Sequence, residues 1–250
     1  MDIIYEVTSL AEIDAAVESF MGYDPAMESN TMTAIKNIVI KAVDAIARII
    51  SNIIFRIRNF LRQLKGKPLR ISHDQALAIG SMCFKVNRMY YDTDQSIFTD
   101  NSGDMLASTA KLFARHPEKF DERLKILDQY SAEIDDMIEK FKEIEHPIFG
   151  KGDHGSNPEL NRAFYTEDMK STRKLMDKMS EDLKIWTRFL NDVKSGKMDN
   201  WRDIRRWYSD DEEELPNPAD VQRVLTFLTK RYAIMEASIA KITALTSQFE

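Results

Sequence analysis

One pair of side chains in the sequence has the spacing of a metal-binding motif. Glu143 and His146 stand three residues apart, which places a carboxylate and an imidazole on one face of a helix, as in di-iron helical bundles. Such a site needs a second Glu-x-x-His motif and further inward-facing glutamates, and the sequence contains no second copy. The pair also comes directly before Pro147, at an expected helix end where histidine is common. We therefore predict no metal site and no cofactor here.

Two further stretches fall short of the chemistry that they suggest. The Gly-Lys-Gly sequence around Lys151 lacks the Gly-x4-Gly-Lys-Ser/Thr form of a phosphate-binding loop. Four aspartates crowd one predicted loop at residues 92–104, but the central glycine and terminal glutamate of a calcium loop are missing. We expect solvated loops in both places, and no catalytic residue anywhere in the chain.

A mixture of tryptophan and arginine occupies residues 200–208, in the sequence NWRDIRRWY. Such a mixture is found where bases stack or phosphates bind. The acidic run at 210–214 follows directly and would repel a nucleic acid. This pattern favours a local cap on the fold with the tryptophans packed inward, and the alternative is a protein-contact patch.

The most unusual segment is residues 34–64, AIKNIVIKAVDAIARIISNIIFRIRNFLRQL. At about 100° per residue the isoleucines, valines and leucines fall in one wide arc and the charged residues fall opposite, which predicts a strongly amphipathic helix. Phe55 projects into the polar arc, where a solvated face would not need an aromatic ring. A partner covering that face would explain it. The candidate binding residues are Lys41, Arg48, Phe55, Arg56, Arg58 and Arg62.

Charge is distributed unevenly along the chain. Residues 1–30 carry seven acidic and no basic residues, whereas residues 31–70 carry nine basic residues against Asp44 alone. The whole chain has a net charge of −6, so the remainder, residues 71–250, is also acidic. An acidic leader therefore precedes a basic helix, and an acidic body follows.

Three interpretations of the basic helix stay open. Its apolar face can pack into a bundle while its arginines lie on the acidic body. It can lie on an anionic membrane surface, or its basic residues can contact nucleic-acid phosphate or an acidic partner protein. It is not expected to span a membrane, because its longest uncharged run is residues 49–55 and a span needs roughly 20 apolar residues. The leader lacks the positive region of a secretory signal peptide.

The rest of the sequence predicts an all-α fold. Glycine and proline are few, at 8 and 7 residues, and capping boxes at Ser9 and Ser72 predict helices over 9–20 and 72–91. A further helix is expected over 104–115. Apolar residues then recur in steps of four and three over 120–145, 172–193 and 221–249, which indicates long helices packed as in coiled coils. The single cysteine, Cys83, excludes an internal disulfide and is expected to be buried.

These signals predict an antiparallel helical bundle with shorter N-terminal helices. We divide the chain into an acidic leader at 1–28, a basic amphipathic helix at 29–70 and the bundle at 71–250. A helical enzyme would need titratable groups converging inside the bundle, and the three seams hold almost none. We therefore expect no enzyme.

The order of these features resembles the head-interior virion proteins of large tailed phages. The resemblance covers residues 1–65 and consists of the acidic leader, the sequence Ala26-Met-Glu28-Ser29 and the basic helix. In that family a prohead protease cuts after glutamate, with a small residue two positions earlier, so the resemblance implies a cut between Glu28 and Ser29. It also implies a virion protein whose acidic leader masks the basic helix until assembly.

The sequence thus predicts a non-enzymatic structural or interaction protein, in the host cytoplasm or inside a virion. Its basic helix would dock on an acidic or apolar protein partner. The alternative is a membrane-surface or nucleic-acid-binding protein that acts through residues 34–70.

Overall fold

The computed structural model describes residues 31–66, 71–94, 116–144, 169–195 and 218–247. These residues form five α-helices and contain no strand, which confirms the predicted all-α bundle. The helices are α2 (Thr31–Gly66), α3 (His73–Asp94), α5 (Pro117–Glu143), α7 (Lys170–Lys194) and α9 (Pro218–Thr246). The helices expected at 9–20 and 104–115 lie outside the described residues.

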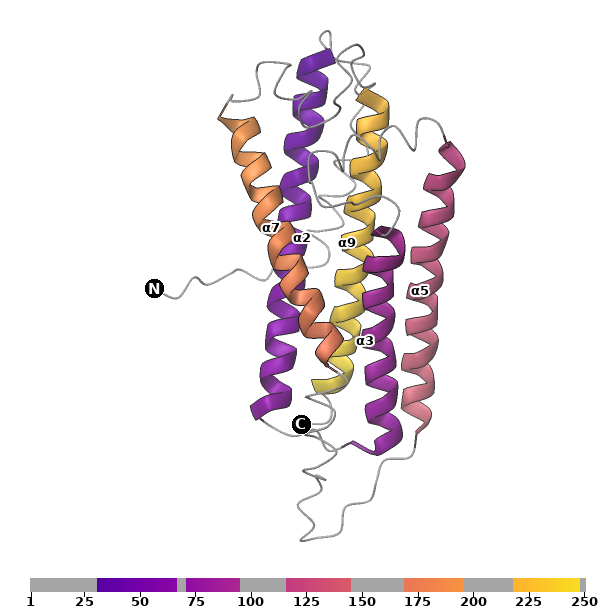
Figure 1. The fold of residues 1–250 in the computed structure, drawn as a ribbon. Helices are drawn as coiled ribbons and strands as arrows, with labels where there is room; N and C mark the ends of the chain where they lie inside the picture. The colour runs from indigo at the N-terminus through magenta and orange to yellow at the C-terminus, as the bar shows by residue number, and fades with distance from the viewer. Residues whose placement is uncertain (1–30, 67–70, 95–115, 145–168, 196–217, 248–250) are drawn as a thin grey trace.

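The helices lie side by side as one elongated bundle (Figure 1). α2 packs between α7 and α9, while α3 contacts α5, α7 and α9. Pairs of contacts show the relative directions of the helices. Asp44 contacts Lys194, and Phe55, further along α2, lies beside Leu183, which comes earlier in α7, so α2 and α7 are antiparallel. By the same kind of contact α2, α5 and α9 run one way and α3 and α7 the other. Consecutive described helices therefore alternate in direction, as predicted, whereas α2 and α9 are parallel neighbours in space.

Local sequence signals set the helix starts. Ser72 and Gln75 form the predicted capping box, in which the Gln75 N–H donates to Ser72 Oγ (3.2 Å) and the Ser72 N–H donates to Gln75 Oε1 (2.9 Å). Each bond satisfies a backbone donor that the first helical turn leaves free. Pro117 and Pro218 open α5 and α9, where their missing N–H costs no intrahelical bond.

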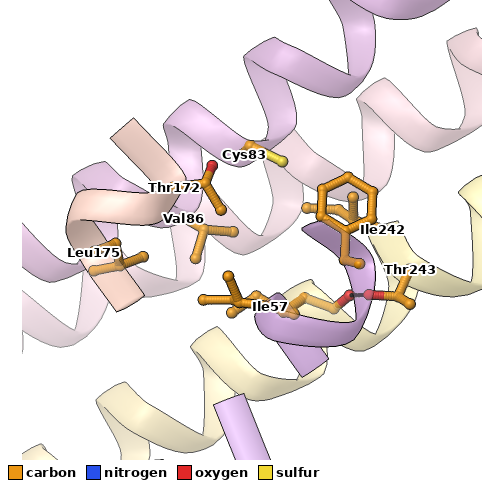
Figure 2. A pocket seen from close by; sticks show the side chains of 9 residues that line it. Ile57, Cys83, Val86, Thr172, Leu175, Ile242 and Thr243 are labelled. Carbon is orange, nitrogen blue, oxygen red and sulfur yellow. Dashed lines mark hydrogen bonds between the residues drawn. The ribbon is translucent and has the colours of Figure 1, made fainter. Parts of the chain in front are cut away.

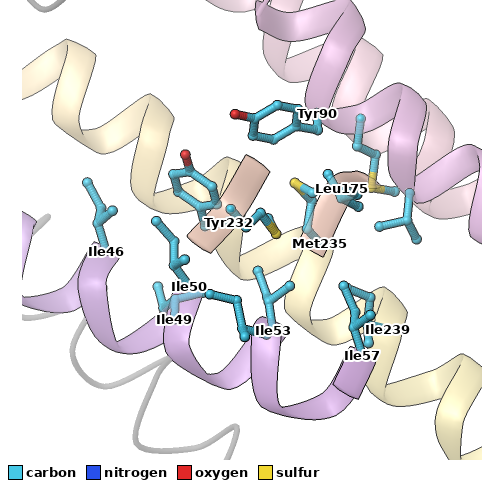
Figure 3. Close-up of a cluster of buried hydrophobic side chains, with 14 of the residues drawn as sticks. Ile46, Ile49, Ile50, Ile53, Ile57, Tyr90, Leu175, Tyr232, Met235 and Ile239 are labelled. Atoms are coloured by element: carbon cyan, nitrogen blue, oxygen red, sulfur yellow. The ribbon is translucent and has the colours of Figure 1, made fainter. Parts of the chain in front are cut away.

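The isoleucine face of α2 forms a large part of the core (Figure 3). Its buried isoleucines are Ile38, Ile46, Ile49, Ile50, Ile53, Ile54 and Ile57. Each fully buried isoleucine contributes about 1.5–3 kcal/mol through removal of apolar surface from water. Residues 31–66 therefore share one core with the later helices. That face can enter a bilayer only if α2 leaves the bundle.

α9 is buried on more than one side. Its buried residues at the predicted steps of four and three are Leu225, Leu228, Tyr232, Met235, Ile239, Ile242 and Thr246. Residues between these steps are buried as well, namely Val224, Phe227, Thr229, Arg231, Glu236, Ser238 and Leu245. The two hydroxyl side chains among them bond within the helix: Thr229 Oγ1 donates to the Leu225 carbonyl (2.7 Å) and Ser238 Oγ donates to the Ile234 carbonyl (2.9 Å). α9 is thus the central helix, in contact with α2, α3 and α5.

Candidate functional site

The outward side of α2 carries a regular stripe of long side chains. Lys41, Arg48, Phe55 and Arg62 follow one another every seven residues, and all four are exposed. Seven residues fall only about 20° short of two full helical turns, so these side chains lie nearly in line. Phe55 interrupts the cationic line and is 37% exposed. We call Lys41, Arg48, Phe55, Arg58 and Arg62 the α2 stripe.

A groove lies beside Phe55, between α2 and α7. It has a volume of about 250 Å³ and is lined by Ser51, Ile54, Phe55, Arg58, Ser180, Leu183 and Lys184. Ser51 and Ser180 each donate a hydrogen bond of 2.8 Å to a backbone carbonyl of their own helix. The hydroxyls are therefore engaged, and the groove offers an apolar floor with two cations. Such a surface suits an apolar side chain that is accompanied by negative charge.

The cations of the stripe differ in how far they are already neutralised. Arg48 forms an ion pair with Asp44 of its own helix, and Lys194 of α7 approaches the same carboxylate at 3.5 Å. Within the described part of the chain, Arg58, Arg62 and Lys184 have no ion-pair partner. Positive charge is consequently least compensated around the groove.

Arg56 does not belong to the exposed stripe. Its Nε donates to Glu236 Oε1 of α9 at 2.5 Å, and the Glu236 side chain is fully buried. The guanidinium therefore neutralises a carboxylate inside the bundle. We assign Arg56 to the packing of α2 on α9, although the sequence placed it among the binding residues.

The bundle interior contains a titratable cluster that sequence reasoning missed. Tyr90 Oη donates to Asp182 Oδ2 (2.5 Å), and Tyr232 Oη donates to the same oxygen (3.2 Å). Arg231 donates to Tyr232 Oη (2.8 Å) and lies over the rings of both tyrosines, at 5.0 and 4.6 Å from their centroids. Figure 3 shows the two tyrosines together above the α2 isoleucines.

This cluster corrects the expectation that ionisable groups are nearly absent from the interior. Arg231 and Glu236 each stand next to a seam residue of α9, at positions that a one-seam helix would expose. Only the packing of α9 on several helices reveals their burial. The groove beside Phe55 and a smaller cavity at Cys83 are lined by other residues, so the cluster ties α3, α7 and α9 together without facing either of them.

Cys83 lies at a small apolar cavity beneath α2 (Figure 2). The cavity measures about 20 Å³, and its lining includes Ile57, Cys83, Thr172 and Ile242. Burial raises the pKa of the Cys83 thiol to about 12, and the neighbouring Thr172 hydroxyl opposes this only in part. The thiol therefore stays protonated and is a poor nucleophile, in line with its expected buried position.

Several sequence-based assignments fall outside the described residues. These are the cleavage residues Ala26, Glu28 and Ser29, the tryptophan-arginine stretch at 200–208, and His146. Within the described ranges no group of three or more His, Cys, Asp or Glu side chains is placed to hold a metal ion. The same ranges contain no helix long and apolar enough to cross a membrane.

Comparisons of the chain with known protein families, with curated proteins and with solved structures found no match. A function for this chain therefore has to be argued from its own surface. The α2 stripe and the groove beside Phe55 are the features that combine exposure, charge and an apolar anchor point.

Proposed function

We propose that the protein is a non-enzymatic structural or interaction protein that binds an acidic segment of a partner protein on the α2 stripe. The observation that supports this most directly is the groove at Phe55, where Arg58 and Lys184 carry positive charge without an ion-pair partner in the described part of the chain. An aromatic or aliphatic side chain of the partner fills the groove, and its carboxylates meet the two cations. Aromatic and arginine residues are the usual energetic centres of such interfaces.

Burial of the isoleucine face favours a protein partner over a membrane. The apolar residues that would enter a bilayer already pack against α7 and α9, and releasing them would cost the core most of its contacts with α2. The remaining outward side of α2 offers one phenylalanine among cations, which is little apolar area for membrane insertion.

Net charge favours a short acidic segment over a long polyanion. The chain carries a net charge of −6, so a nucleic acid or an extended anionic bilayer meets repulsion from the body as it approaches the stripe. A short acidic segment can contact the cations of α2 and avoid the rest of the surface. Its binding should weaken as salt rises, because the contacts are exposed.

The resemblance to phage head-interior proteins supplies a setting for this proposal. In that setting the partner is another virion component, and the acidic leader occupies or shields the stripe until residues 1–28 are removed. The intact mass of the protein from its native source tests the setting. A first residue of Ser29 supports it, whereas an uncut chain in mature particles contradicts the virion setting and leaves the α2 stripe to be tested by binding.

Binding of a defined probe to the full chain and to a chain beginning at Ser29 tests the docking function. The probe is an oligoglutamate peptide with one central phenylalanine, and the same peptide with alanine in its place is the matched ligand. We expect the phenylalanine peptide to bind more tightly. The double variant Arg58→Glu with Lys184→Glu should weaken its binding by at least about tenfold, a change equivalent to about 1.4 kcal/mol.

The control variant is Lys125→Glu, which reverses an exposed charge on α5, far from the groove. An equal loss of binding in this variant would show that only net charge matters and would contradict the proposed site. Vesicles containing phosphatidylserine and duplex DNA serve as competing ligands. If the vesicles or the DNA bind the chain that begins at Ser29 more tightly than the peptide does, the membrane or nucleic-acid alternative replaces the proposal.

A further inference from the structure

A second exposed seam runs along α3, on a different surface from the α2 stripe. Leu77, Phe84 and Tyr91 are 50%, 52% and 36% exposed and stand seven residues apart. Ser81 and Arg88 lie between them, so the five residues follow steps of four and three. This is the spacing of a coiled-coil seam. We call these five residues the α3 seam.

The α3 seam has a hollow as well as projecting side chains. A cavity of about 390 Å³ opens beside Phe84, and its lining includes Leu77, Gly80, Ser81 and Phe84, with Met137 of α5 at its edge. Gly80 leaves room there because it has no side chain. A cavity of about 150 Å³ is sufficient to hold a benzene ring, so this hollow can receive an aromatic side chain from outside. The seam thus offers both a knob and a hole.

The helices on the two sides of the α3 seam carry opposite charge. In Figure 1, α7 and α5 lie on opposite sides of α3. α5 contains nine acidic and five basic residues, a net charge of −4. α7 contains seven basic and four acidic residues, a net charge of +3. A partner that pairs with α3 must therefore present positive charge to α5 and negative charge to α7.

A second copy of this chain meets that requirement in one orientation. If two α3 helices pair in parallel about a twofold axis that runs along them, the α7 of each copy faces the α5 of the other. Ser171 of α7 and Met137 of α5 line the same cavity, so these parts of the two helices are level. The exposed Lys170 and Lys174 then come opposite Glu133 and Asp136 of the second copy, two carboxylates that pair with Lys85 and Lys140 within one copy.

An antiparallel pairing lacks this complementarity. It would place α7 against α7 and α5 against α5, so that like charges meet. The parallel arrangement also brings Leu77, Phe84 and Tyr91 of one copy against the same residues of the other, as in an isologous dimer. Arg88 on the seam is already neutralised by Asp92 of its own helix, with Nε and Oδ2 2.6 Å apart.

We propose that the protein forms a homodimer through parallel pairing of its α3 seams, with Phe84 of each copy entering the hollow beside Phe84 of the other. The inference is independent of the acidic-segment site, because the cavity beside Phe84 and the groove beside Phe55 share no lining residue. It assigns the exposed apolar residues of α3 to contact between two copies.

Light scattering on the full chain after size exclusion, over a range of concentrations, tests the dimer. We expect the wild-type chain to have the mass of a dimer. Phe84→Lys should have the mass of a monomer, because its dimerisation should be weakened at least about tenfold. Phe55→Lys is the matched control, because it makes the same change at an exposed phenylalanine of α2 and should leave the dimer intact. Circular dichroism checks that each variant folds, and Leu77→Lys provides a second test at the seam.

The two proposals fail separately. Phe84→Lys should keep the binding of the acidic peptide, and Phe55→Lys should lose it. If the wild-type chain is monomeric at every concentration, the dimer proposal is wrong and the partner of the α3 seam is a different protein. A dimer mass that persists in both Phe84→Lys and Leu77→Lys also overturns it.

A disulfide tests the orientation. Ser81→Cys should form a crosslinked dimer under mild oxidation if the helices are parallel, because the two residues then meet across the axis. In an antiparallel pair centred on Phe84 they would be about 9 Å apart along the helices, beyond the reach of a disulfide. The wild-type chain, with only the buried Cys83, is the control. Failure to crosslink a dimeric Ser81→Cys variant overturns the parallel arrangement.

Discussion

The two sides of α2 use the same kinds of residue for opposite purposes. On the inward side, Arg56 pairs with the fully buried Glu236, and isoleucines fill the core. On the outward side, Arg48 pairs with Asp44 at the surface, and Arg58 and Arg62 face solvent. An arginine on one side pairs inside the bundle, whereas an arginine a short distance away on the other side is exposed to solvent. Position on the helix, and not residue type, decides the role.

The largest effect is expected from removing the inward arginine. Arg56→Ala should lower the free energy of unfolding by about 3–5 kcal/mol, because it leaves the Glu236 carboxylate buried without its cation. Urea denaturation measures the loss. Replacing both partners with methionine should restore much of the stability, since the unpaired charge is then gone. A stable Arg56→Ala protein would show that water reaches Glu236 and that the two sides of α2 differ less than the structure indicates.

A somewhat smaller loss is expected at the isoleucines. Ile53 is fully buried, so Ile53→Ala should destabilise the fold by about 2–5 kcal/mol through lost burial and a cavity. Gln63→Ala on the exposed side of the same helix is the control and should change stability by no more than about 0.5 kcal/mol. Thermal or urea unfolding compares the two variants. Equal effects would mean that α2 is not held in the core as described.

The thiol beneath the inward side of α2 gives a pH-dependent test. Burial raises the Cys83 pKa from its ordinary value of 9.0 to about 12, so between these values the unfolded chain has lost a proton that the folded chain keeps. Stability from this group is present below pH 9 and falls as pH rises, by up to about 1.4 kcal/mol per pH unit.

Urea denaturation of the wild type and of Cys83→Ala at several pH values up to 10 measures this contribution. The free energy of unfolding of the wild type should fall relative to that of Cys83→Ala as pH increases. A thiol reagent should also label native protein far more slowly than unfolded protein. Parallel pH profiles and rapid native labelling would place Cys83 in contact with solvent.

The smallest effect is expected on the outward side. Arg48→Ala removes a surface ion pair whose arginine side chain is 63% exposed, so the free energy of unfolding should fall by only about 0.2–1 kcal/mol. Urea denaturation of Arg48→Ala and Arg56→Ala under the same conditions compares the outward and inward sides of α2 directly. A loss at Arg48 as large as that at Arg56 would contradict the division of α2 into two sides.

Much of the fold follows from local sequence signals. The helix expected at 34–64 is present as α2, and the capping box at Ser72 begins α3 with both predicted bonds. Phe55 was identified from angular position alone, because the period of a helix assigns each residue a direction. These features depend on residues close in sequence, which is why they could be predicted.

The interior polar cluster could not be predicted in the same way. Tyr90, Asp182 and Arg231 come from three helices that are far apart in sequence, and no periodicity states which helices will meet. The buried partner of Arg56 could not be predicted for the same reason. This carboxylate partner lies on α9, so the sequence of α2 contained no sign that this arginine turns inward.

The amino-acid sequence alone determined that the described part of the chain is helical, where α3 begins, and that α2 has an apolar and a cationic side. Those properties arise from backbone hydrogen bonding and from the 3.6-residue period, which act over a few residues. Only the tertiary structure decided that α9 is central, that Glu236 and Arg231 are buried, and that the grooves at Phe55 and Phe84 exist. Burial and grooves result from which helices pack together, and that choice is made by the whole chain.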